Sequence, residues 1–125
     1  MHHTFLKTKL HRATITAADP NYEGSVTIDS DLCRAAGLME YEQVDVLDIT
    51  NGLRFTTYVI FGEAGSGEVQ VNGAAAQLVK PGDLAIIIAY CHLSTDEIAT
   101  HKTRVLLFEG RNKIASTQEH PVRKP

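Results

Sequence analysis

The stretch QVDVLDITNGLRFTTYVIFGE, residues 43–63, decides the fold class of this chain. Apolar and polar residues alternate on both sides of Asn51-Gly52, as in strands whose successive side chains point to opposite faces of a sheet. Asn-Gly tolerates positive φ, so the dipeptide predicts a two-residue hairpin turn. Arg54 and Tyr58 have the same parity on the second strand and should project from one face. The stretch therefore predicts a β-hairpin.

Similar patterns on both sides extend this interpretation to a mainly-β protein. Further strands are expected within 5–16, 25–29, 69–79, 84–90 and 103–110. In the first of these, Lys7, Lys9 and His11 should share a face. The tail from residue 117 has no such pattern and is expected to be loose. Six or seven short strands with two small helices predict one domain, residues 1–125, built as a small β-barrel.

The two expected helices carry capping signals. Asp29 or Ser30 can cap a helix that Gly37 ends, because glycine readily adopts the left-handed conformation of a helix C-terminus. Ser94 and Glu97 have the spacing of a capping box and predict one helical turn after residue 94.

Composition excludes several function classes. The chain has 125 residues and a net charge of −3, with 12 Lys and Arg against 15 Asp and Glu that are scattered along it, so no basic stripe predicts nucleic-acid binding. No apolar run reaches the roughly 20 residues of a membrane span, and the start MHHTFLKTKLHR lacks a secretory signal. A cytoplasmic protein is expected. Cys33 and Cys91 lie in apolar stretches without metal-ligand spacing, which favours reduced thiols.

The Gly24-Ser25 pair in NYEGSVTID, residues 21–29, can do more than form a turn. A turn glycine before a strand-opening serine is the commoner explanation of such a pair. A serine hydroxyl can nevertheless attack the preceding carbonyl carbon, which moves the acyl group from nitrogen to oxygen and replaces an amide with an ester. The shift needs a strained peptide and donors for the developing oxyanion, and β-elimination of the ester would then leave a ketone. The candidate donors are Thr57, Tyr58 and Asn72.

Five separated blocks together identify a family. The blocks KLHRATIT, ADPNYEGSVTID, TNGLRFTTY, VNGAAA and KPGD occur in this order between residue 3 and residue 110. With this spacing the chain resembles the pyruvoyl-dependent aspartate 1-decarboxylases, which make β-alanine for pantothenate and coenzyme A synthesis. The resemblance implies a double-psi β-barrel and a homotetramer with sites between adjacent subunits. It also implies self-cleavage into a small chain, residues 1–24, and a pyruvoyl chain, residues 25–125.

The resemblance further assigns the chemistry. Ser25 would become a covalent pyruvoyl group that forms a Schiff base with L-aspartate and accepts the electrons released as CO2 leaves, and Tyr58 would return the proton. Lys9 and Arg54 match positions that hold the substrate, and two cations suit a substrate with two carboxylates. Other positions match with smaller roles: Thr57, Gly73, Ala74 and Ala75 in substrate binding, Gly24, Thr57 and Asn72 in self-cleavage, and His11 and Tyr22 in support. Whether another protein triggers maturation is left open.

Other motifs and functions receive simpler interpretations. The histidines lack carboxylates or cysteines at ligand spacing, so no metal site is expected. Gly65-Ser66-Gly67 lacks the Lys-Ser/Thr ending of a phosphate loop and is expected to turn a hairpin. The alternative functions are a non-enzymatic β-barrel binding module and a hydrolase that uses Ser25 and His11. The hydrolase lacks an acidic partner and a nucleophile-elbow motif.

Overall fold

The computed structural model describes residues 1–125 as strands joined by short turns, with little helix. In chain order the elements are β1 (His2–Thr14), β2 (Ala17–Asp19), β3 (Ser25–Asp29), α1 (Ser30–Ala36), β4 (Gln43–Asp48), β5 (Arg54–Gly62), β6 (Val69–Asn72), the 3-10 helix η1 (Gly73–Leu78), β7 (Leu84–Ser94), α2 (Thr95–Ile98), β8 (Lys102–Glu109) and β9 (Lys113–Pro121). The prediction of a mainly-β fold is confirmed. No helix is long and apolar enough to cross a membrane.

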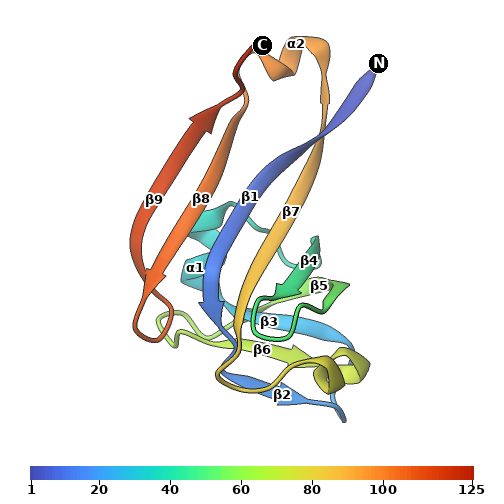
Figure 1. Ribbon diagram of the computed structural model, residues 1–125, viewed down its shortest axis with the longest axis vertical. Helices are drawn as coiled ribbons and strands as arrows, with labels where there is room; N and C mark the ends of the chain where they lie inside the picture. Colours follow the sequence, from blue (N-terminus) through green and yellow to red (C-terminus); the bar gives the residue numbers. More distant parts are fainter.

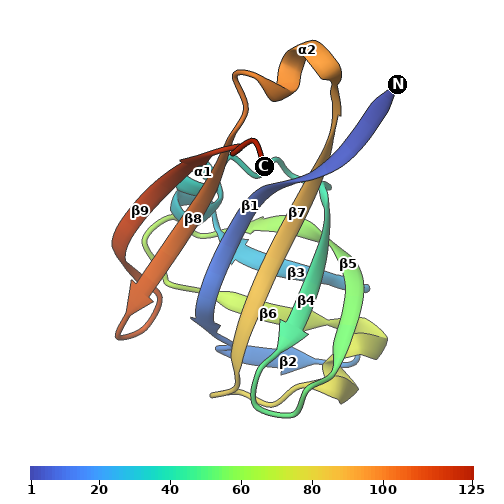
Figure 2. The same ribbon diagram turned by 45° about the horizontal axis from the view of Figure 1, so that its top comes forward.

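All the strands belong to one mixed sheet with the order β2-β6-β3-β5-β4-β7-β1-β8-β9. The sheet curls, so that β2, β3 and β6 run across the lower end of β1 and β7 (Figures 1 and 2). The buried core lies inside this curl and consists mainly of Val, Ile, Leu and Ala. The double-psi arrangement within this sheet stays a prediction.

The hairpin of β4 and β5 forms as predicted, but its turn is longer. Asp45 pairs with Thr56 and Leu47 with Arg54, and five residues, 49–53, connect the strands. Only Gly52 in this turn has positive φ, at 79°, and its N–H donates to the Asp48 carbonyl. A two-residue turn of this type needs positive φ at both central residues, so the prediction of such a turn was wrong.

The capping predictions are confirmed. The Asp29 carboxylate accepts from the Asp31 N–H at the start of α1, and Gly37 ends that helix with φ at 77°. At α2, both hydrogen bonds of the Ser94/Glu97 capping box are present.

Two sequence expectations near the ends of the chain were wrong. Residues 117–121 are not loose, because they belong to β9, which pairs with β8 from Lys113 to Pro121. Gly110 and Asn112 make the reverse turn with φ of 56° and 53°. In β1, a register shift between Leu6 and Thr8 interrupts the alternation at Lys7, whose ammonium pairs with Glu42 at 2.7 Å.

Candidate active site

Ser25 begins the strand β3, between β6 and β5. It pairs with Asn72 of β6, and the next residue, Val26, pairs with Val59 of β5. Tyr58 precedes Val59, so Ser25 and Tyr58 are at matching positions of parallel neighbours, and their side chains project to the same face. Ser25 is buried. The structure therefore brings together Ser25, Asn72 and Tyr58 from three of the five sequence blocks.

A hydrogen-bond network fixes the Ser25 hydroxyl. Its Oγ accepts from Asn72 Nδ2 at 3.0 Å and donates to the Glu23 carbonyl at 3.3 Å. Asn72 Nδ2 also donates to Thr27 Oγ1 at 3.0 Å. Gln70 Nε2 donates to Asn72 Oδ1 at 2.7 Å, so all the polar atoms of the Asn72 side chain have partners.

Gly73 lies directly against the bond that precedes Ser25. A Cβ atom added to Gly73 would be 2.5 Å from Gly24 Cα and 3.2 Å from the Tyr22 carbonyl oxygen. Its φ of 78° also favours glycine. Real Cβ atoms do not approach this closely, so the first residue of η1 must be glycine for the Tyr22–Gly24 segment to pack here. The VNGAAA and ADPNYEGSVTID blocks are therefore in contact.

An open pocket of about 480 Å³ lies beside Tyr58. Tyr41, Gln43, Thr56 and Thr57 complete its wall. The rings of Tyr41 and Tyr58 have centroids 6.2 Å apart. Thr57 lines this pocket but forms no hydrogen bond with Ser25, so its expected part in self-cleavage has no direct contact to support it.

Lys9, Arg54 and His11 do not converge on Ser25 within one chain. Lys9 pairs with Ile88, Ile88 with Asp45, and Asp45 with Thr56, which places Lys9 four strands from Ser25, roughly 19 Å along the sheet. Arg54 lies four residues before Tyr58 on β5, roughly 13 Å away.

His11 lies on the same strand as Lys9 and is also remote from Ser25. Its Nδ1 is buried without a hydrogen-bond partner. Burial, with help from the neighbouring charges of Lys9 and Arg12, lowers the pKa of His11. The imidazole is thus neutral near pH 7.

The residues around the Gly24-Ser25 bond differ in their exposure to solvent. Tyr22 has 58 % of its surface exposed, whereas Asn72 and Gly73 are buried. Ala74 is exposed and Ala75 half-buried on η1. The backbone of this short helix is therefore accessible next to a buried serine.

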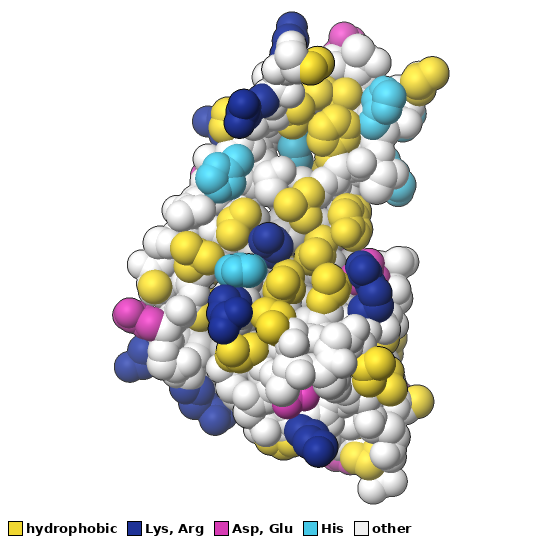
Figure 3. All heavy atoms as spheres, viewed as in Figure 1, with side chains coloured by type: hydrophobic (Ala, Val, Ile, Leu, Met, Phe, Trp, Pro, Cys, Tyr) yellow, Lys and Arg dark blue, Asp and Glu magenta, His cyan; other side chains and the backbone are white.

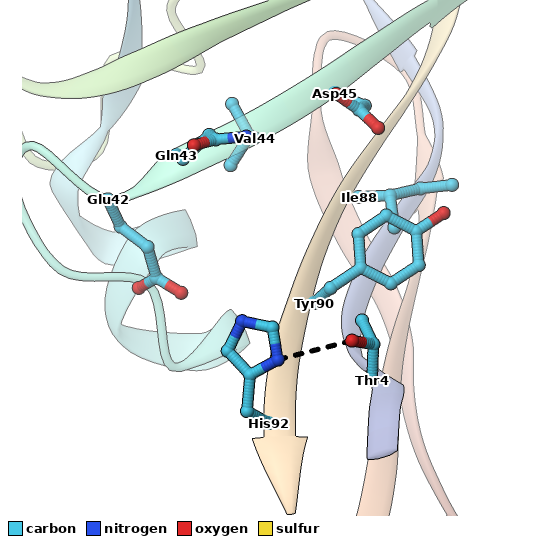
Figure 4. Close-up of a pocket in the computed structure, with 8 residues that line it drawn as sticks. All are labelled: Thr4, Glu42, Gln43, Val44, Asp45, Ile88, Tyr90 and His92. Carbon is cyan, nitrogen blue, oxygen red and sulfur yellow. Dashed lines mark hydrogen bonds between the residues drawn. The ribbon is translucent and has the colours of Figure 1, made fainter. Parts of the chain in front are cut away.

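A second pocket, of about 320 Å³, opens on the outer face of β4 and β7 (Figure 4). Glu42 and Asp45 lie on its wall, and Thr4 Oγ1 and His92 Nδ1 are 3.1 Å apart across it. Lys7 already neutralises Glu42, and the remaining Asp45 carboxylate offers no cation to a dicarboxylate substrate, so this pocket is the weaker candidate for aspartate.

The Gly65-Ser66-Gly67 turn already binds a carboxylate of the chain itself. The N–H groups of Gly65 and Gly67 donate to Asp29 at 3.1 and 2.9 Å. The amides that could hold a phosphate are therefore occupied. The chain holds no group of three or more His, Cys, Asp or Glu placed to bind a metal ion, and both cysteines are free thiols.

Sequence reasoning missed Gln70 and Thr27. Both contact Asn72, and Gln70 lies two residues before Asn72 on β6, so the two side chains share a face. That spacing was the available signal. The spacing alone did not identify Gln70 as a functional residue, because a glutamine in a strand is neither a nucleophile nor an acid or base.

Comparisons with known proteins agree with the geometry. The family model described as aspartate decarboxylase matches residues 1–115. The chain is 52 % identical over 118 residues to aspartate 1-decarboxylases of Caldicellulosiruptor saccharolyticus and Caldicellulosiruptor bescii, with 92 % of each chain covered. It is 48 % identical over 120 residues to aspartate 1-decarboxylase of Clostridium acetobutylicum, covering 96 % of this chain and 94 % of that one. This chain belongs to the aspartate decarboxylase family.

Proposed function

We propose that this protein decarboxylates L-aspartate to β-alanine and CO2, using a pyruvoyl group that it makes by cutting itself between Gly24 and Ser25. The main support is the placement of Ser25, buried beside Asn72 and Tyr58, with Gly73 packed against the bond to be cut. The product would serve pantothenate and coenzyme A synthesis. A cytoplasmic location fits two unpaired thiols.

The cleavage would proceed in balanced steps. Ser25 Oγ attacks the Gly24 carbonyl carbon, the C–N bond breaks, and the nitrogen takes up the hydroxyl proton. Loss of the Ser25 Cα proton then breaks the Cβ–Oγ bond, which frees the Gly24 carboxylate and leaves a dehydroalanine. Its enamine tautomerises, and water replaces the nitrogen as ammonia to give the ketone.

The residues present fit a pyruvoyl group at position 25. The position is buried, its neighbour Asn72 supplies an N–H donor, and no bulky side chain crowds the junction because both Gly24 and Gly73 lack Cβ atoms. When formed, the group supplies an electron sink for decarboxylation. Tyr58, on the same face of the adjacent strand, would return the proton.

Substrate binding would require a second copy of the chain. Lys9 lies four strands from Ser25 in the sheet of one chain, on an outer face that also carries aliphatic side chains. Half-exposed aliphatic residues line this face: Leu47, Ile86, Ile88, Val105 and Leu107. Hydrophobic side chains gather over β1 and β7 with basic and histidine side chains among them (Figure 3). We therefore propose a homotetramer in which one subunit supplies Lys9 and Arg54 to the Ser25 site of another.

Intact-mass analysis of the purified protein tests the proposal. Two fragments are expected, ending at Gly24 and beginning at residue 25, with the larger lighter than its serine form by one ammonia. Ser25→Ala should stay whole and produce no β-alanine. Tyr58→Phe should cleave and trap aspartate on reduction with borohydride, but release product more slowly. An active protein with an intact Gly24-Ser25 bond would refute the pyruvoyl mechanism. A protein that stays whole and makes no β-alanine would refute the proposal and leave a binding module as the better description.

A further inference from the structure

We propose that Gln70 is a positioning residue for self-cleavage, which holds the Asn72 amide with its N–H group toward Ser25 Oγ. The inference rests on the proposed self-cleavage, and its basis is the chain of hydrogen bonds from Gln70 through Asn72 to Ser25. Gln70 itself touches neither Ser25 nor the bond to be cut. It acts through Asn72.

The orientation of the Asn72 amide decides whether Ser25 Oγ faces a hydrogen-bond donor or an acceptor. The Ser25 hydroxyl donates its proton to the Glu23 carbonyl, so its oxygen is free to accept from Asn72 Nδ2. If the amide were turned over, Asn72 Oδ1 would face Ser25 Oγ and compete for the hydroxyl proton. A donor on Gln70, 2.7 Å from Asn72 Oδ1, stabilises the observed orientation.

The orientation matters most when the Cβ–Oγ bond breaks. Both bonding electrons then move onto Oγ, which becomes part of the Gly24 carboxylate, and an N–H donor stabilises that developing charge. Hydrogen bonds in series polarise one another, so the bond from Gln70 makes the Asn72 N–H a better donor. The Asn72 amide nitrogen also donates to Thr27 Oγ1 at 3.0 Å, which further restrains its orientation.

Gln70→Glu reverses the polarity with almost no change of shape. A carboxylate accepts only, so Asn72 should turn its N–H group toward residue 70 and its oxygen toward Ser25. Cell-free synthesis followed by intact-mass analysis at intervals measures the rate of cleavage. Losing one oriented hydrogen bond should slow cleavage about tenfold at pH 7.5. Gln77→Glu, an equal charge change at an exposed site on η1, is the matched control and should cleave as wild type does.

Lowering the pH distinguishes a role in orienting Asn72 from a merely structural role, because only the first makes the cleavage rate of Gln70→Glu depend on pH. Below the ordinary pKa of glutamate, about 4.3, the carboxylate introduced at position 70 regains a proton and can donate again. The ratio of the Gln70→Glu rate to the wild-type rate should therefore rise as the pH falls toward 4.5, whereas the ratio for Gln70→Met, which has no donor, should stay low and flat. Gln70→Met also replaces Gln70→Glu if the latter fails to fold.

The possible results distinguish a failure of the role of Gln70 from a failure of self-cleavage itself. Cleavage of Gln70→Glu and Gln70→Met at the wild-type rate would overturn the role of Gln70, as would a rate ratio for Gln70→Glu that does not change with pH. If the wild-type chain itself stays whole, the proposed function has failed before Gln70 is tested.

Discussion

Asp48 and Asp83 form a buried carboxyl pair where the β4–β5 turn meets the residues before β7. Asp48 Oδ1 accepts from the Asn51 N–H at 3.1 Å, and Asp83 Oδ2 accepts from the Lys80 N–H at 3.0 Å. Asp48 Oδ2 is buried without a hydrogen-bond partner, and burial, helped by the neighbouring carboxyl of Asp83, raises the pKa of Asp48. We therefore predict that the two groups hold one proton between them, because carboxylates only accept. The stability of the fold should therefore depend on the protonation of this one pair of side chains.

The pair affects stability in opposite directions at the two ends of the pH range. Burial, followed by the neighbouring Asp83 carboxyl, raises the pKa of Asp48, whereas the neighbouring Asp48 carboxyl and then the Lys80 N–H lower the pKa of Asp83. The contribution of Asp48 is complete below about pH 3.9, its unfolded pKa, and is lost as the pH rises through its folded pKa. That of Asp83 is lost as the pH falls through its lowered pKa.

Asp48→Asn should remove the loss of stability that occurs as the pH rises through the raised pKa of Asp48. The amide keeps a donor toward Asp83 without titrating, so the variant should gain a few degrees in Tm over wild type at pH 8 and show little difference near pH 4. Thermal unfolding followed by circular dichroism across this range measures the effect. Asp96→Asn, at an exposed position on α2, serves as control. Parallel Tm curves for wild type and Asp48→Asn would show that no proton is shared.

Contacts between elements determine the shape of the Tyr22–Gly24 segment, which precedes Ser25. The Tyr22–Gly24 segment joins β2 to β3 and is held by Gly73 at the start of η1. Asp19 adds to this, since its carboxylate accepts from the Asn21 N–H at 3.0 Å. The shape of the Tyr22–Gly24 segment therefore depends on a neighbouring element as much as on the segment itself.

Gly73→Ala tests this contact against a matched glycine. Gly73 and Gly52 have nearly the same positive φ, 78° and 79°, but a Cβ on Gly52 meets nothing within 4 Å. Gly52→Ala should lower the free energy of unfolding by about 1 kcal/mol through backbone strain, and Gly73→Ala should lower it by more, because its Cβ also meets the Gly24 backbone. Only Gly73→Ala should slow self-cleavage, by more than about tenfold, because its Cβ displaces Gly24. Equal cleavage rates in the two variants, measured by intact mass, would mean that the contact has no part in the reaction.

Local signals in the sequence predicted some elements well and others poorly. The caps of α1 and α2 were predictable because each depends on residues three to eight positions apart. β9 was not, since its polar sequence contains no apolar alternation and its pairing with β8 depends on the turn at Gly110 and Asn112. Among the candidate site residues, Ser25, Tyr58 and Asn72 were predictable from the family blocks, whereas Gln70 has meaning only once β6 lies beside β3.

For the whole molecule, the proposed homotetramer predicts that Lys9 of one chain serves the Ser25 site of another. Co-expression of Ser25→Ala and Lys9→Ala chains, each with its own tag, tests this. Lys9 of an uncleaved Ser25→Ala chain can complete the site of a Lys9→Ala partner, so mixed oligomers purified through both tags should recover a measurable part of the wild-type β-alanine production. Each variant alone should be nearly inactive. Mixed oligomers no more active than the separate variants would place the whole site within one subunit.

The position of β1 between β7 and β8 has a consequence for the life of the molecule after cleavage. If the chain is cut as proposed, the 1–24 fragment would keep hydrogen bonds on both sides of its long strand, so it would stay in place although no covalent bond would retain it. Folding happens with one continuous chain, but any later refolding would need two separate peptides to meet. Once cut, the protein would depend on never unfolding, and its lifetime would be set by the rate at which β1 escapes from the sheet.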